Sequence, residues 1–119
     1  GIEALAVESM LAARHFGAEE QVLASLARTC PGIGWDAHLP DYLISRVAEH
    51  GRRRAAEMRE VARTLADAGV EPTMACATAE RQDRLIDAMT AAGVRYMHDE
   101  EFSWRALADA LAAAPASKR

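Results

Sequence analysis

Glycine and proline divide this sequence into segments whose lengths suit helices. Gly17, Gly69 and Gly93 each follow a run with apolar residues at helical spacing, and glycine is the favoured residue just past a helix C-terminus. The composition between these breaks is dominated by alanine and leucine, which are strong helix formers, and β-branched residues are sparse. The sequence therefore predicts an all-α domain, a bundle of five to six helices without a sheet.

The breaks and the cap residues predict where each helix lies. Asp36 is a plausible N-cap, Ser103 caps a last short helix, and a break or kink is expected around His50 and Gly51, because glycine weakens a helix interior. The predicted helices span residues 2–16, 18–29, 37–49, 52–68, 72–92 and 104–113.

Length and charge narrow the classes of function. A chain of 119 residues is one domain by size, and we expect residues 1–113 to form it, with 114–119 as a disordered tail. The net charge of −4 argues against nucleic acid as the main partner. No apolar run is long enough to cross a membrane, and no secretory signal is present. Cys30 and Cys76 match no metal spacing and are expected to be reduced thiols of a cytoplasmic protein, with Cys76 a small core residue.

The first helix is apolar on most of its circumference. Ile2, Leu5 and Phe16 share one side, while Val7 and Met10 fall on the other. A helix of this kind is usually buried on most sides, which a small domain cannot provide alone. The segment also begins without a capping residue, so either it frays at a terminus or it continues a helix from a preceding segment. We predict a homodimer that covers this helix.

The stretch "HGRRRAAEMREV" places three arginines in a first helical turn, where positive charge opposes the helix dipole. The helical pattern puts Arg52, Arg53, Arg59 and Arg63 on a solvated charged face, with Arg53 paired to Glu57. Arg54 and His50 instead extend the apolar stripe that includes Met58, Val61 and Leu65. A guanidinium there needs an acceptor. Two partners remain open: an internal carboxylate such as Glu3 or Glu8, or the carboxylate or phosphate of a bound molecule.

Three stretches carry a resemblance to a known family. "GIEALAVESMLAARHFG", "PGIGWDAHLPDYL" and "HGRRRAAEMREVARTLADAGVEPTMACATAERQ" resemble the C-terminal helical domain, catalogued as a domain of unknown function, of bacterial NAD(P)-dependent oxidoreductases. These enzymes are similar to 6-phosphogluconate dehydrogenase and the β-hydroxyacid dehydrogenases. The resemblance covers residues 1–95. Its most specific residues are His50, Arg53, Arg54, Glu57, Met58 and Glu60, followed by Gly69 and Pro72.

The resemblance implies a role in a larger enzyme. An N-terminal Rossmann domain of the same protein, absent from this chain, would bind NAD or NADP. This chain would close the cleft for a small acidic substrate, such as a hydroxy acid, and form the dimer. His50, Arg53 and Arg54 would face that cleft and bind the substrate or the cofactor phosphates. The chain has no strand followed by a Gly-rich fingerprint, and Lys118 is its only lysine. We therefore assign no catalytic residue and expect no cofactor or activity for the chain alone.

Other features of the sequence are weaker indications of function. "HDEE" (98–101) has metal-ligand residue types without a fixed spacing, and a solvated acidic turn explains it, so no metal is expected. Trp35 and Trp104 are expected to be packing residues. Two other functions remain open: a free-standing helical protein-interaction module, and a small anion-binding domain without redox activity. The coding sequence upstream of Gly1 would discriminate between these and the dehydrogenase reading.

Overall fold

The computed structural model describes residues 1–114 and contains helices but no strand over that range. The helices are α1 (Ile2–His15), α2 (Glu19–Thr29), α3 (Leu39–Asp67), α4 (Thr73–Ala92) and α5 (Trp104–Ala112). The predicted all-α class is confirmed. The disordered tail predicted at 114–119 falls almost wholly on residues 115–119, which lie outside the described residues.

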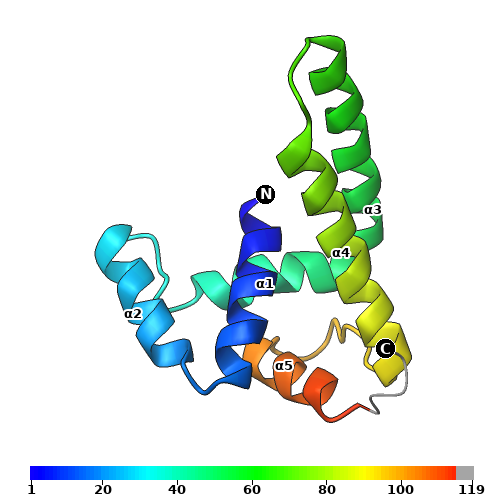
Figure 1. The fold of residues 1–119 in the computed structure, drawn as a ribbon. Coiled ribbons are helices and arrows are strands. Elements are labelled where there is room, and N and C mark those ends of the chain that lie inside the picture. The colour runs from blue at the N-terminus through cyan, green and yellow to red at the C-terminus, as the bar shows by residue number, and fades with distance from the viewer. Residues whose placement is uncertain (115–119) are drawn as a thin grey trace.

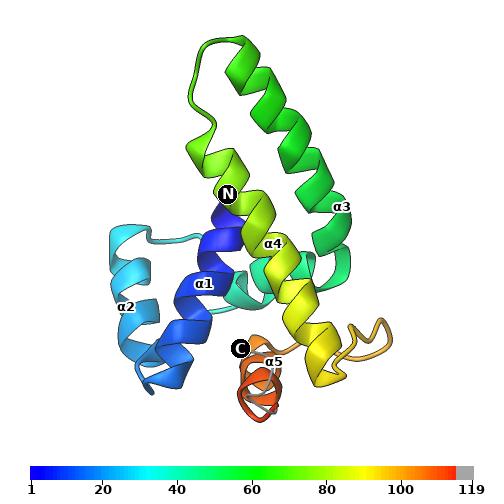
Figure 2. The same cartoon turned by 45° about the vertical axis from the view of Figure 1, so that its right-hand side comes forward.

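Helix α3 organises the fold. Its first half runs beneath α1, and its second half turns away and forms an antiparallel hairpin with α4 (Figure 1). The tip of this hairpin projects beyond the other helices, whereas α2 lies alongside α1 and α5 lies near the C-terminal end of α1 (Figure 2). The hairpin therefore has one end in the body of the domain and one end in solvent.

The bend in α3 lies where the sequence predicts it. His50 has φ −122° and ψ 15°, outside the helical range, and it joins two segments that together form one bent helix. At Gly51, an added Cβ would lie 2.7 Å from Cγ1 of Ile86 and 3.2 Å from the carbonyl oxygen of Gln82. Glycine at this position lets α3 and α4 approach closely directly after the bend.

The core is built from residues of all five helices and from Trp35 in the loop between α2 and α3. Its most deeply buried side chains are Trp104, Met10, Ile44, Val7 and Val47. Helix α5 begins at two caps: Ser103 Oγ accepts a hydrogen bond from the Ala106 amide (3.1 Å), and the Asp41 carboxylate accepts one from the Trp104 amide (2.8 Å). The cap predicted at Ser103 is confirmed, and both tryptophans are buried packing residues as expected.

The domain buries only one side of α1, whereas the apolar pattern predicts burial on most sides. Val7 and Met10 are fully buried within the chain, whereas Ile2, Leu5 and Phe16 are exposed. The helix is apolar on nearly all sides, so its sequence could not determine which side the rest of the domain covers. Contact with α3, α4 and α5 covers the side of Val7 and Met10.

Three further expectations are wrong. Val61 is exposed because α4 packs against the small residues Gly51, Ala55 and Ala62 rather than against the larger apolar stripe. Cys76 is exposed rather than a core residue, because the buried face of α4 carries Ala75 and Ala79 instead. Helix α3 begins after His38, not after Asp36. No helix among residues 1–114 is long and apolar enough to span a membrane.

Candidate anion-binding site at the bend of helix α3

Arg54 is held by an internal carboxylate. Its Nε and Nη2 donate to the two carboxylate oxygens of Glu3 at 2.8 and 3.0 Å. The Glu3 side chain is only 11% exposed and that of Arg54 28%. This two-point geometry is the strongest form of a guanidinium–carboxylate contact. Of the two partners left open by the sequence, the described residues supply the structural one.

Arg52 lies at the surface as predicted, with 55% of its side chain exposed, but it is also paired with acidic residues of another helix. Its guanidinium donates across the hairpin to Asp83 Oδ1 at 2.9 Å and also pairs with Asp87. Arg59 reaches the other oxygen of Asp83 at 2.7 Å. Hydrogen bonds donated by Arg52, and then by Arg59, lower the pKa of the Asp83 carboxyl. The hydrogen bonds that Arg52 donates to Asp87 and to Asp83 raise the pKa of Arg52. These pairs join α3 to α4, a contact that the sequence of one helix cannot reveal.

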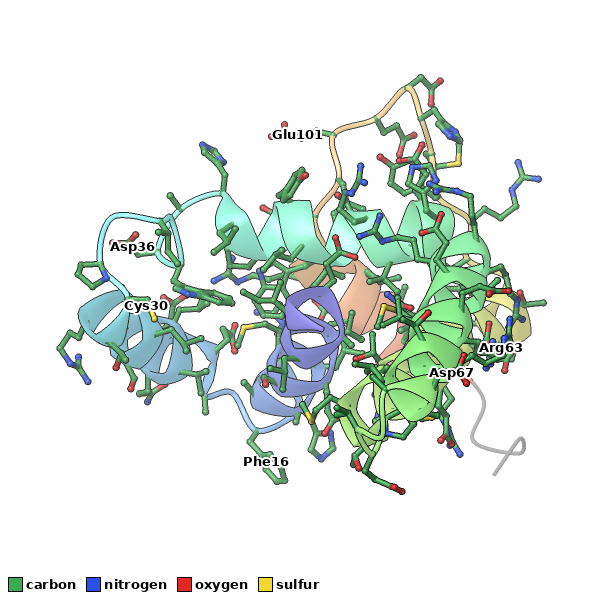
Figure 3. All side chains as sticks on the ribbon, turned by 90° about the horizontal axis from the view of Figure 1, so that it is seen from above. Phe16, Cys30, Asp36, Arg63, Asp67 and Glu101 are labelled. Carbon is green, nitrogen blue, oxygen red and sulfur yellow. The ribbon has the colours of Figure 1, made fainter. Side chains whose placement is uncertain are left out.

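Arg53 and Arg63 are exposed like Arg52 and Arg59, and their acidic partners lie on α3 itself. Arg53 is 57% exposed and donates to Glu57 at 3.0 Å, the pair expected from their spacing. Arg63 pairs with Glu60 and points outward from the second half of α3 (Figure 3). Each of the three arginines that begin this half of α3 thus has an acidic partner, which offsets their unfavourable position at a helix start.

His50 contacts a carboxylate that the sequence analysis did not single out. Glu49 Oε1 lies 3.2 Å from His50 Nε2, and Glu49 Oε2 lies 3.0 Å from Nε2 of His98, in the loop between α4 and α5. One carboxylate therefore links the bend of α3 to a distant loop. With Nε2 occupied, Nδ1 of His50 is the nitrogen left to contact another group.

Arg46 is the second residue that the sequence analysis missed. Its Nε lies 3.8 Å from Glu3 Oε2, and its guanidinium lies 5.8 Å from the centre of the Tyr42 ring. A signal for it was present, because Tyr42, Arg46, His50 and Arg54 follow one another at intervals of four along α3. Residues four apart share a helix face. Glu3 contacts Arg46 and Arg54, so this row runs past the start of α1.

The three predicted site residues are therefore arranged differently from one another. Arg54 is directed to α1, Arg53 is turned to solvent, and His50 lies on the bend beside Glu49. Within residues 1–114, no three histidine, cysteine, aspartate or glutamate side chains converge as a metal site requires. The arrangement can bind a small anion with guanidinium and imidazole groups, and we find no nucleophile arranged with a base.

A separate hollow lies between the end of α4, the following loop and α5. Met89, Val94, Tyr96, Phe102 and Leu107 line it, with Arg95, Glu100 and Glu101 at its edge. It contains none of the three predicted site residues. Its lining is mainly apolar, and the charged row on α3 is not part of it.

The comparisons with known proteins identify a family and one solved relative. The family model described as "Domain of unknown function (DUF1932)" matches residues 13–85. A solved structure described as the conserved hypothetical protein from Sinorhizobium meliloti 1021 is 33% identical with a TM-score of 0.75. The match covers 93% of this chain and 36% of that one, so this chain spans about a third of the relative's length. No curated protein matches the chain.

Proposed function

The chain belongs to the DUF1932 family, and we propose that it is the C-terminal substrate-cleft and dimerisation domain of an NAD(P)-dependent dehydrogenase acting on a small hydroxy acid. One observation carries the proposal. The basic row of α3, with Arg46, His50 and Arg54, lies beside the start of α1 and offers guanidinium donors for a carboxylate. The length of the solved relative adds support, since a chain nearly three times as long has room for a cofactor-binding domain.

The described residues do not fit a dinucleotide. Such cofactors bind where a Gly-rich turn joins a strand to a helix. Gly32 and Gly34 do have the positive φ of tight turns, but their loop joins α2 to α3 and no strand precedes it within residues 1–114. In the proposed enzyme another domain holds the nicotinamide cofactor, and the chain described here binds and orients the substrate.

Each predicted site residue has a proposed role in that cleft. Arg54 fixes α1 against the bend through Glu3 and keeps Nη1 available for an anion. Arg53, exposed and only partly engaged by Glu57, attracts the acidic substrate or the cofactor phosphates. His50 Nδ1 accepts a hydrogen bond from the substrate hydroxyl, with Glu49 holding the imidazole.

The dimerisation role is supported by an apolar groove between α1 and α4. Leu5, Met74 and Ala77 line it, and Glu8 and Arg81, which form an ion pair, lie at its edge. Leu5 is 56% exposed and Met74 67% exposed, an unusual state for large apolar side chains so close together. The same groove would suit the alternative, a free-standing interaction module.

The reading frame upstream of Gly1 and the activity of its product test the proposal. We expect that frame to encode a strand–GxGxxG–helix unit and a lysine-bearing helix, and the purified product to reduce NAD⁺ or NADP⁺ with a hydroxy acid. A product that binds neither nicotinamide cofactor would contradict the dehydrogenase proposal. A complete product without a dinucleotide-binding unit would instead favour the interaction module.

A further inference from the structure

Arg46 is the arginine at the bend of α3 whose donors remain available. Arg52, Arg53 and Arg54 each donate hydrogen bonds to carboxylates, whereas the Arg46 guanidinium makes none within residues 1–114. Its nearest carboxylate oxygen, Glu3 Oε2, is 3.8 Å from Nε, beyond hydrogen-bond distance. The Arg46 side chain is 35% exposed, so a ligand can reach it.

Glu3 cannot accept hydrogen bonds from Arg46 as it does from Arg54. Both carboxylate oxygens of Glu3 already accept hydrogen bonds from Arg54. One negative charge, that of Glu3, therefore faces the two positive charges of Arg46 and Arg54. A guanidinium at such a place gains most from a second oxyanion with two oxygens in one plane, because its own donors form a planar fork.

The surroundings of Arg46 hold its guanidinium in place without using its donors. Tyr42, one turn earlier, places its ring 5.8 Å from the guanidinium carbon, within the range of a cation–π contact. Glu3 attracts the guanidinium from the side of α1. A side chain fixed in this way loses less conformational entropy when it binds a ligand.

We propose that Arg46 binds the oxyanion of a small ligand, a carboxylate or a phosphate group, and that the Glu3–Arg54 pair positions Arg46 for this contact. His50, the next residue in the row, is placed to contact a neighbouring hydroxyl through Nδ1. This inference deepens the proposed function and rests on it where the ligand is a hydroxy acid: Arg46, rather than Arg54, then binds the substrate carboxylate.

The test titrates the 119-residue chain with lactate and, separately, with inorganic phosphate, with chloride at matched ionic strength as the control. NMR signals of the arginine Nε–H groups report the site. We expect saturable shifts at Arg46 with lactate, phosphate or both, and no saturation with chloride. The oxyanion that binds more tightly identifies the ligand group. Shifts that follow ionic strength alone would overturn the inference.

Substitutions assign the effect to Arg46. Arg46→Gln should weaken binding by about tenfold to a hundredfold, the usual effect of losing hydrogen bonds to a charged group. Arg46→Lys, which keeps the charge but loses the planar fork, should recover only part of the affinity. Arg28→Gln is the matched control, because Arg28 is exposed on α2 and the substitution removes the same charge. Equal affinities for the Arg46→Gln variant and the wild-type chain would overturn the inference.

The two proposals can fail separately. If the longer protein oxidises a hydroxy acid and Arg46→Gln leaves its KM unchanged, the assignment of Arg46 is wrong and the dehydrogenase proposal stands. If the longer protein has no such activity but the chain still binds an oxyanion at Arg46, the dehydrogenase proposal is wrong and the anion site stands.

Discussion

Glu3 in the first turn of α1 accepts two hydrogen bonds from Arg54, 51 residues later in the chain, at 2.8 and 3.0 Å. The pair ties the start of α1 to the part of α3 that directly follows its bend. Both side chains are mostly buried, so the charge of each depends on the other for compensation. Arg54 is therefore first a structural residue, whatever else it contacts.

Replacing Arg54 by alanine should lower the stability of the fold. The loss leaves the Glu3 carboxylate buried without its partner, and we expect the free energy of unfolding to fall by about 1.5–3 kcal/mol. Arg53→Ala removes the same charge but only a surface pair, which typically contributes about 0.2–0.5 kcal/mol. Urea unfolding of both variants measures the contrast. Similar small losses in both would show that the Glu3–Arg54 pair does not stabilise the domain.

Local signals in the sequence were sufficient for several features of this fold. Gly51 indicated the break at the bend, Ser103 indicated the start of α5, and Arg54 on the apolar stripe indicated the need for an acidic acceptor, with Glu3 among the candidates. Each of these depends on a residue type and its place within one helix. The backbone physics of glycine and serine and the cost of an unpaired guanidinium act in any surroundings.

Features that depend on how helices meet were not predicted. The pairing of Arg52 and Arg59 with Asp83 was not predicted, because Asp83 lies on another helix. The place of Arg46 beside Glu3 was not predicted, because the two residues come together only when α1 packs on α3. The side on which α1 packs was also left open, because all sides are apolar. These results depend on the packing of α1 and α4 on α3, for which one sequence supplies no pattern.

The ion pairs across the hairpin predict a dependence of stability on pH. The Asp83 carboxyl has its pKa lowered below the ordinary value of 3.8 by Arg52 and Arg59, so it stabilises the fold when ionised. This contribution is present above the ordinary value and is lost as the pH falls through the lowered one. Asp83→Asn should therefore lower the melting temperature at neutral pH, and the difference from the wild-type chain should vanish in strong acid.

The control for this pH effect lies on the same hairpin. Asp67 ends α3, points to solvent in Figure 3 and forms no ion pair within residues 1–114. Asp67→Asn removes the same formal charge but no ion pair. Its effect on the melting temperature should therefore be small. A difference between wild type and Asp83→Asn that stayed constant from neutral to acidic pH would contradict the account, since it would not come from an ionised carboxylate.

A methyl group at position 51 should push α3 and α4 apart. In Gly51→Ala the new Cβ would lie 2.7 Å from Ile86 Cγ1 and 3.0 Å from its Cδ1. Overpacking of this kind costs about 1–3 kcal/mol, partly offset by the higher helix propensity of alanine, about 1 kcal/mol. Calorimetry should show a lower melting temperature. In an Ile86→Ala background, which removes both carbon atoms, the same change should be much less harmful; equal losses in both backgrounds would exclude the clash as the cause.

The proposed homodimer can be tested by placing a single charged side chain in the groove between α1 and α4. The domain itself buries Val7 and Met10, so no second copy is needed to cover that side of α1. The exposed apolar side chains beside the groove are Leu5 and Met74 instead. Light scattering at micromolar concentration should show a dimer for the wild-type chain and a monomer for Leu5→Glu and Met74→Glu, because an unpaired carboxylate in an apolar contact is unfavourable.

Phe16 is the matched control: it is 80% exposed and points outward at the turn after α1 (Figure 3), so Phe16→Glu should remain dimeric. A monomeric wild-type chain would refute the dimer, and a monomeric Phe16→Glu variant would place the interface elsewhere.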